Sequence, residues 1–213
     1  FPYTTLFRST HHRFSMDSTD TILDLFRLDG KKALVTGGSK GLGKAAALAL
    51  AQAGCDAVIA SRTAAELQQT ARSITEATDR KIIPFCCNVR NLEEVNRLVH
   101  TCVNELGGLD IIVNSAGINN RKLIVDLSED EFQEIIDINL TGTFRVCKAA
   151  GPFLLKQKSG RVINISSMLD QITIPGRTGY ASSKGGVAML TKTLALEWAP
   201  YNIRVNAISP GPF

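Results

Sequence analysis

Tyr180 and Lys184 lie four residues apart at the start of a long helical pattern. Residues at i and i+4 share one face of a helix, so the phenol and the ammonium would be neighbours. A phenol has a reference pKa near 10, too high for easy proton exchange at neutral pH, but a nearby ammonium stabilises the phenolate. The pair therefore predicts a general acid for the reduction of a ketone, or a general base in the reverse direction.

Ser167 lies 13 residues before Tyr180, directly after a predicted strand at 161–165. In open α/β sheets, ligands bind at the carboxyl ends of the strands. A serine hydroxyl at this edge would hydrogen-bond the substrate oxygen and stabilise a developing alkoxide. The adjacent Ser166 is the competing candidate.

The elements that must position these side chains begin near Leu28, where short apolar runs start to alternate with longer amphipathic stretches. The predicted strands are 33–36, 57–60, 81–86, 110–113, 161–165 and 204–208. The predicted helices are 44–51, 64–77, 92–105, 129–138, 142–156 and 179–198. Strands that are apolar throughout are typical of parallel sheets covered on both faces. The pattern predicts one α/β domain over 27–213, a doubly wound parallel sheet of the Rossmann-like kind.

A glycine-rich turn connects the first strand to the first helix, with the sequence Thr36-Gly37-Gly38-Ser39-Lys40-Gly41-Leu42-Gly43. Glycine lets the backbone approach a pyrophosphate, and the following helix N-terminus offers unpaired N–H groups to the anion. We therefore expect cofactor contacts from Thr36, Gly37, Ser39, Lys40, Gly41, Leu42 and Gly43.

The second strand ends at Ser61-Arg62. NAD-specific sites usually place a carboxylate there to bind the ribose 2′-hydroxyl. Arg62 and Lys40 could instead bracket a 2′-phosphate, because guanidinium suits phosphate geometry. The sequence thus favours NADP(H), with NAD(H) as the alternative. A simpler interpretation is that both cations are solvated surface charges.

The Thr36–Gly43 turn and the Tyr180/Lys184 spacing, TGxxxGxG and YxxxK, resemble those of the short-chain dehydrogenase/reductase family, over about Leu28 to Phe213. The resemblance selects Ser167 over Ser166 and implies that Asn139 holds a water that relays protons to Lys184. Further cofactor contacts implied by the resemblance are Asn88, Val89, Asn114, Ala116, Gly117, Tyr180, Lys184, Pro210 and Gly211. Two positions depart from the family's pattern: Asn88, where aspartate is commoner, and Ser115, where asparagine is commoner.

The resemblance implies an oxidoreductase that interconverts a ketone and a secondary alcohol. Segments 116–121 and 180–194 are most similar to gluconate 5-dehydrogenases and related sugar-acid enzymes, with 3-oxoacyl-[acyl-carrier-protein] reductases as the alternative. A non-catalytic dinucleotide-binding protein would not need Tyr180, Lys184 and Ser167 together. A methyltransferase would be expected to carry a carboxylate near Arg62.

Composition excludes several other classes of protein. The net charge of +4 is spread without a dense basic run, which argues against nucleic acid as a partner. No apolar run reaches the roughly 18 residues that a membrane span needs, and no signal peptide is visible, so we expect a cytoplasmic protein. The five cysteines have no metal-ligand spacing, which predicts reduced core thiols and no metal site.

The two ends of the chain carry separate expectations. Residues 1–9 read FPYTTLFRS, which matches the translation of a sequencing adaptor, so 1–26 is expected to be a disordered leader. The chain stops directly after a strand-like run. We therefore expect the last strand of the sheet to be missing, leaving a sheet edge and apolar surface exposed. Family resemblance implies a homotetramer or homodimer through helices 142–156 and 179–198.

Overall fold

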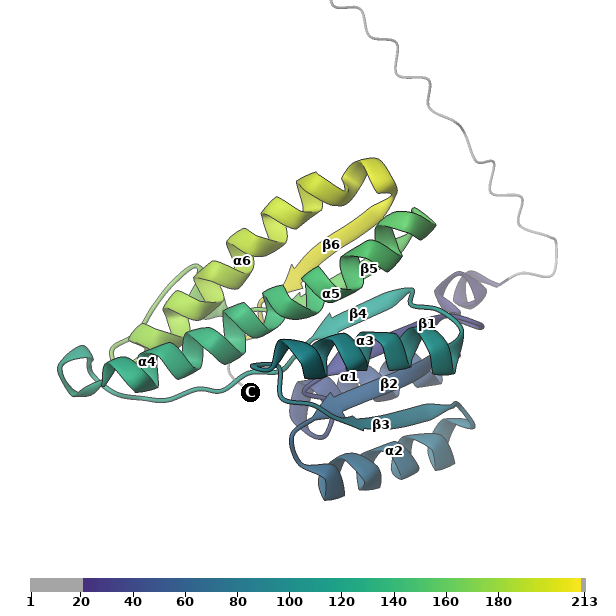
Figure 1. Cartoon of the computed structure of the whole chain (residues 1–213), viewed down its shortest axis with the longest axis horizontal. Coiled ribbons are helices and arrows are strands. Elements are labelled where there is room, and N and C mark those ends of the chain that lie inside the picture. The colour runs from purple at the N-terminus through teal and green to yellow at the C-terminus, as the bar shows by residue number, and fades with distance from the viewer. Residues whose placement is uncertain (1–20, 212–213) are drawn as a thin grey trace, which may run out of the picture.

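A six-stranded, fully parallel sheet organises the chain in the computed structural model, which describes residues 21–211 (Figure 1). The strand order is β3-β2-β1-β4-β5-β6. The order reverses between β1 and β4, which confirms the predicted doubly wound fold and places its topological switch point there. The strands are β1 Lys32–Thr36, β2 Asp56–Ser61, β3 Ile82–Cys86, β4 Ile111–Asn114, β5 Gly160–Ile165 and β6 Ile203–Ile208.

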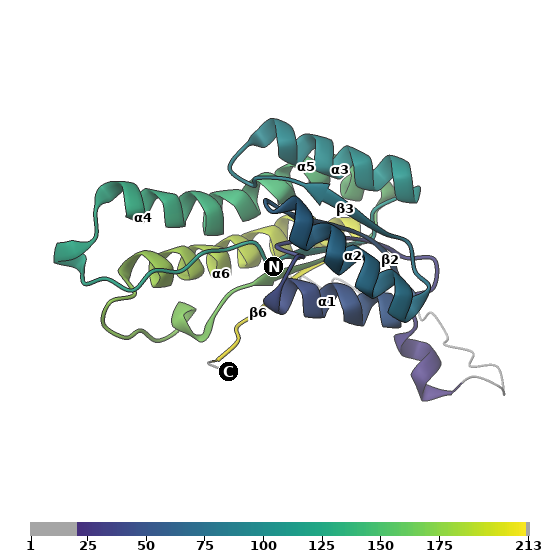
Figure 2. The same ribbon diagram turned by 90° about the horizontal axis from the view of Figure 1, so that it is seen from below.

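Helices cover both faces of the sheet (Figure 2). The α-helices are α1 Gly41–Gln52, α2 Ala64–Thr78, α3 Leu92–Leu106, α4 Glu129–Ile136, α5 Gly142–Gln157 and α6 Thr178–Trp198. One apolar core joins α1 and α2 to the sheet through side chains such as Ala47 and Leu67. The second core joins α3 and α5 to the opposite face through Leu98 and Val146.

The helices differ from prediction at two places that matter for the site. The first helix begins at Gly41 rather than 44, because Gly41 and Gly43 of the glycine-rich turn already belong to its first turn. The predicted helix 129–138 ends at Ile136 and continues through a π-helical turn, Asp137–Thr141, into α5. A wider turn therefore holds Asn139.

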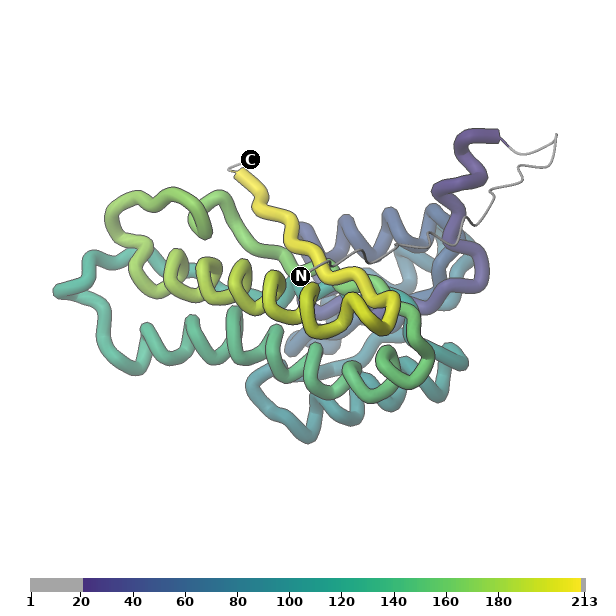
Figure 3. Tube along the Cα trace, turned by 90° about the horizontal axis from the view of Figure 1, so that it is seen from above, coloured from purple at the N-terminus to yellow at the C-terminus, as the bar shows by residue number. Residues whose placement is uncertain are grey.

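Helices α5 and α6 lie side by side (Figure 3). Together with α4, the first turns of α6 project beyond the carboxyl ends of the strands (Figure 1). The start of α6 carries Tyr180 and Lys184. Of the helices in residues 21–211, none is both long and apolar enough to cross a membrane.

The strands β3, β5 and β6 are less buried than the three strands at the centre of the sheet. Strands β1, β2 and β4 are buried along nearly their whole length, whereas β3, β5 and β6 alternate between buried and accessible positions. Strand β6 is the sheet edge, and its Ile208 is 52% exposed. Helix α6 packs against β6, while the last three residues of this strand, 206–208, are exposed.

Two expectations drawn from the sequence need correction: the disordered leader over 1–26 and the burial of all five cysteines. Ile22–Phe26 forms a 3₁₀ turn capped by Thr21, not part of a disordered leader, although none of its side chains is buried. Residues 1–20, including the adaptor-like segment, fall outside the described part of the chain. Cys86 is exposed at the end of β3, while the other four cysteines are core thiols as predicted.

Candidate active site

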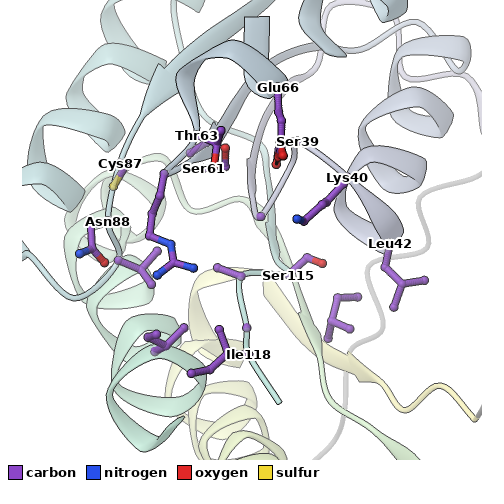
Figure 4. Close-up of a pocket in the computed structure, with 18 of the residues that line it drawn as sticks. Ser39, Lys40, Leu42, Ser61, Thr63, Glu66, Cys87, Asn88, Ser115 and Ile118 are labelled. Atoms are coloured by element: carbon purple, nitrogen blue, oxygen red, sulfur yellow. Dashed lines mark hydrogen bonds between the residues drawn. The ribbon is translucent and has the colours of Figure 1, made fainter. Parts of the chain in front are cut away.

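A cavity of about 320 Å³ opens at the carboxyl edge of the sheet, beside the switch point between β1 and β4 (Figure 4). It brings together the glycine-rich turn and the start of α6, which are about 140 residues apart in the chain. The predicted residues that line it are Gly37, Ser39, Lys40, Leu42, Ser61, Arg62, Asn88, Val89, Ala116, Gly117, Tyr180 and Lys184. The cavity therefore brings together residues predicted for cofactor binding and residues predicted for proton transfer.

The glycine-rich turn owes its shape to close backbone contacts. Gly37 has φ +68°, and a Cβ there would lie 2.8 Å from the backbone nitrogen of Ala116. A Cβ on Gly43 would overlap the carbonyl oxygen of Gly37. The Thr36 hydroxyl accepts hydrogen bonds from the backbone N–H groups of Ser115 and Ala116, at 3.2 and 3.3 Å. Thr36 and Gly43 thus shape the cavity without lining it.

One end of the cavity is polar and carries charges of both signs. Figure 4 shows Lys40 pointing into the cavity, with Ser39, Ser61 and Glu66 grouped beyond it. The Ser61 hydroxyl is buried without a hydrogen-bond partner in the described residues. Glu66, from the first turn of α2, accepts a long hydrogen bond of 3.5 Å from the Ser39 hydroxyl. Neither Lys40 nor Arg62 forms an ion pair with any residue in 21–211.

The segment after β3 forms one wall of the cavity. Asn88 is tied into a turn, because its side-chain oxygen accepts from the Arg90 N–H at 3.1 Å and its own N–H donates to Glu94 at 2.8 Å. Val89 is buried beside it. Burial raises the pKa of the neighbouring Cys87 thiol to about 12, so this thiol stays protonated near neutral pH.

Tyr180 and Lys184 meet at the other end of the cavity. The Lys184 ammonium lies 5.5 Å from the centre of the Tyr180 ring and donates to the Ile165 carbonyl at 2.7 Å. Only 6% of Lys184 is exposed. Burial lowers the pKa of Lys184 to about 8, a drop that the more distant carboxylate of Asp170 partly opposes. The ammonium is thus charged at pH 7 and fixed beside the phenol.

Hydrogen bonding separates the two candidate serines. The Ser166 hydroxyl donates to Asp170 at 2.6 Å and contacts the Lys184 carbonyl at 3.2 Å, so its proton is already engaged. The Ser167 oxygen accepts only the Leu169 N–H, at 3.2 Å. Its proton has no acceptor in the described part of the chain. Although Ser167 does not line the cavity itself, it follows β5 at the same edge.

Asn139 uses its whole side chain to clamp the backbone that lines the cavity. Its Oδ1 accepts from the Ile118 N–H at 2.8 Å, and its Nδ2 donates to the Ile118 carbonyl at 2.9 Å and to the Ser183 hydroxyl at 3.0 Å. A Cβ on Gly117 would lie 3.2 Å from Asn139 Oδ1 and 3.8 Å from Lys184 Nζ. Asn139 therefore lies close to Lys184 but holds Ile118 in place.

Four other predicted residues lie near the cavity without lining it. Asn114 turns into the core, where its Nδ2 donates to Asn164 at 2.9 Å. The carbonyl of Pro210 accepts from the Met168 N–H at 2.9 Å, and Gly211 follows beside the same residue, so both pack against the turn after Ser167. Gly41 has open space around its missing side chain but adopts φ +57°, where glycine is favoured.

Several lining residues were not predicted from the sequence. They are Ala60, Thr63, Glu66, Cys87, Ser115, Ile118, Ile138 and Ile165. Glu66 is the important omission, because it puts a carboxylate near the end of β2 where none was expected. Its position in the first turn of the helix after β2 was the available signal, since that turn also lies at the carboxyl edge.

Comparison with known proteins identifies the class that this fold and site define. The family model described as short chain dehydrogenase matches residues 31–213. A 3-oxoacyl-[acyl-carrier-protein] reductase of Thermotoga maritima is 39% identical over 87% of this chain and 75% of its own. A 2-dehydro-3-deoxy-D-gluconate 5-dehydrogenase of Formosa agariphila is 38% identical over 90% and 72%. The crystal structure of an NAD⁺-bound xylitol dehydrogenase superposes with TM-score 0.84 at 36% identity, over 86% and 70%.

The chain therefore belongs to the short-chain dehydrogenase/reductase family of NAD(P)-dependent oxidoreductases. Its relatives act on sugar acids, polyols or acyl thioesters by name, so the family establishes the reaction class without fixing the substrate.

Proposed function

We propose that this protein interconverts a ketone and a secondary alcohol with NADP(H), on a sugar acid or polyol, through Tyr180, Ser167 and Lys184. The observation that carries the proposal is the convergence of Tyr180 and the buried Lys184 on the cavity that the glycine-rich turn also lines. A non-catalytic dinucleotide-binding protein would have no need for a buried, desolvated ammonium at that position. Burying such a charge costs free energy, which a proton-transfer role would justify.

In this proposal the bound nicotinamide supplies the hydride, and the side chains handle the proton. Tyr180 gives its proton to the substrate oxygen during reduction and takes it back during oxidation. The Lys184 ammonium, held by the Ile165 carbonyl, stabilises the phenolate that remains. The free Ser167 proton is donated to the same substrate oxygen and stabilises its developing charge. Asn139 positions the Ile118 backbone.

Three lining groups of the cavity support a dinucleotide with a 2′-phosphate. The Ser61 hydroxyl is an unpartnered donor there, and Lys40 and Arg62 are cations without ion-pair partners in residues 21–211. A phosphate would satisfy all three groups. Glu66 opposes an anion at this end, but its single carboxylate is outnumbered by the two cations. These groups support NADP(H) as the proposed cofactor.

The first experiment follows NADPH absorbance with 5-keto-D-gluconate and with an acetoacetyl thioester, in the wild type and in Tyr180→Phe. We expect turnover of the sugar acid and a fall of kcat by at least about 100-fold in the variant, the range of general acid catalysis. Fluorescence titration should show that Tyr180→Phe still binds NADPH. Turnover of the thioester alone would indicate a 3-oxoacyl reductase, and unimpaired turnover in Tyr180→Phe would refute the mechanism.

The cofactor assignment has its own test. Arg62→Gln should weaken NADPH binding about 10- to 100-fold, the effect of removing one charged hydrogen-bond donor, while NADH binding changes little. Arg97→Gln, which removes an equal charge from the exposed surface of α3, is the matched control. Equal losses for both cofactors in Arg62→Gln would contradict recognition of the 2′-phosphate.

A further inference from the structure

Thr70 occupies a buried position on α2 where an apolar side chain would be expected. The buried face of this helix consists of Leu67, Thr70, Ala71 and Ile74, and Thr70 is only 3% exposed. Its three apolar neighbours on this face belong to the core shared with α1. Burying a hydroxyl is unfavourable unless it forms a hydrogen bond. The partner of the Thr70 hydroxyl therefore indicates what this residue contributes.

The Thr70 hydroxyl donates to the Ser39 carbonyl at 2.8 Å, across a separation of 31 residues in the chain. A threonine inside a helix often bonds its own helix instead, at the carbonyl four residues back. Thr78, Thr143 and Thr191 all do so, at 2.7–2.8 Å. The bond from Thr70 therefore connects two different elements, helix α2 and the glycine-rich turn.

Ser39 is the residue of the glycine-rich turn that α2 holds. It lines the cavity together with the next residue, Lys40. One helical turn before Thr70, the Glu66 carboxylate accepts a long hydrogen bond of 3.5 Å from the Ser39 hydroxyl. Ser39 is only 8% exposed, and among residues 21–211 Thr70 is the only donor to its carbonyl. Removing the Thr70 hydroxyl would therefore leave a buried acceptor without a partner.

The position of Lys40 depends on how the turn is anchored. Lys40 is the N-cap of α1, and its side chain points into the cavity (Figure 4). Two other anchors lie earlier in the turn: the Thr36 hydroxyl holds the loop after β4, and the Gly38 N–H donates to β2 at 3.0 Å. The bond from Thr70 is closest in the chain to Lys40 and to the helix N-terminus, whose N–H groups would face a cofactor phosphate.

We propose that Thr70 is a positioning residue, which holds Ser39 and Lys40 against α2 and so sets the affinity of the glycine-rich turn for the cofactor phosphates. This inference rests on the proposed function in one respect, the placement of the cofactor in this cavity, and does not depend on the substrate. Thr70 does not line the cavity and acts through Ser39. Without its hydroxyl, the turn would shift to give the Ser39 carbonyl a partner, because an unpaired buried acceptor is costly, and Lys40 would move with it.

The test measures binding of NADPH and of NADH by cofactor fluorescence in wild type and in Thr70→Val, which removes the hydroxyl and keeps the branched shape. Thr70→Val should weaken NADPH binding about 10-fold, the effect of leaving one buried acceptor unpaired. NADH binding should weaken as well, because its pyrophosphate meets the same turn. Thr70→Ser retains the hydroxyl and should restore most of the affinity. Thr78→Val, the matched control, removes a hydroxyl that bonds only α2 and should leave the affinity unchanged.

Three results would overturn the proposal. The first is equal affinity for both cofactors in wild type and Thr70→Val. The second is a loss in Thr70→Ser as large as that in Thr70→Val, because the hydroxyl would then not be the group that matters. The third is an equal loss in Thr78→Val, which would trace the effect to α2 as a whole and not to the bond with Ser39.

A second variant and a kinetic measurement separate positioning from a general loss of structure. Thr70→Ala also lacks the hydroxyl but leaves a cavity, so urea unfolding should show it less stable than Thr70→Val, with the same loss of NADPH affinity. An affinity that fell in step with stability would overturn the proposal. In the ketone assay, Thr70→Val should raise KM for NADPH, while kcat at saturating NADPH stays within about twofold of wild type. Failure of turnover in wild type with these binding differences intact refutes only the proposed reaction.

Discussion

Lys184 is charged at neutral pH although it is almost fully buried. Its ammonium has one strong acceptor, the Ile165 carbonyl, and no carboxylate within ion-pair distance in residues 21–211. Desolvation disfavours the charged form, so the folded protein holds this proton less tightly than the unfolded chain does. The buried charge of Lys184 therefore destabilises the folded protein, although it is positioned for the proposed reaction.

Because burial of the Lys184 charge is unfavourable, we predict that Lys184→Met is more stable than wild type, by an amount that depends on pH. The fall in pKa from 10.5 to about 8 corresponds to about 3 kcal/mol, a penalty fully present below pH 8. The penalty is relieved as pH rises from about 8 towards 10.5, because the unfolded chain then binds more protons than the folded one. Urea unfolding should show Lys184→Met more stable than wild type at pH 7, with a smaller difference at pH 10. A pH-independent difference would contradict the assignment.

At the scale of elements, the turn between β1 and α1 is built by backbone contacts that leave no room for a side chain. A Cβ on Gly43 meets the Gly37 carbonyl, and backbone cannot give way as a flexible side chain can. Gly185, in the middle of α6, has no atom within 4 Å of where its Cβ would be. The two glycines therefore form a matched pair for the same substitution.

We expect Gly43→Ala to destabilise the protein by about 1–3 kcal/mol, the usual effect of overpacking, and to abolish NADPH binding. Gly185→Ala should stabilise α6 by up to about 1 kcal/mol through helix propensity and leave binding intact. Thermal unfolding and fluorescence titration of both variants measure these effects. Normal NADPH affinity in Gly43→Ala would show that the turn can shift without losing the phosphate site.

The elements themselves were largely predictable, because apolar strands and amphipathic helices differ in period. The π-helical turn around Asn139 was not predicted, and the Asn139 side chain bonds the backbone of Ile118, 21 residues away in the chain. Asn114 was predicted at the cofactor, yet its side chain bonds Asn164 on the neighbouring strand. For both Asn139 and Asn114, the position in the sequence correctly predicted a place near the carboxyl edge of the sheet. The direction of each side chain could not be predicted, because it depends on hydrogen-bond partners that are distant in the sequence.

At the scale of the whole molecule, the cysteines are distributed over both hydrophobic layers. Cys55 belongs to the core beneath α1 and α2, whereas Cys87, Cys102 and Cys147 belong to the core beneath α3 and α5. Burial raises the pKa of each of these four thiols to about 12. Only Cys86 is exposed, where it contacts the Arg62 carbonyl at 3.4 Å.

This distribution predicts a single fast-reacting thiol in the native protein. Thiolate, not thiol, attacks disulfide reagents, so protonated buried cysteines react only when their layer opens. With 5,5′-dithiobis(2-nitrobenzoate) at pH 8, one thiol should react at once, and Cys86→Ser should remove that phase. The remaining four should appear together in urea if the shared sheet makes both layers unfold as one cooperative unit. Release of Cys55 before the other three would instead show that the α1–α2 layer opens independently of the α3–α5 layer.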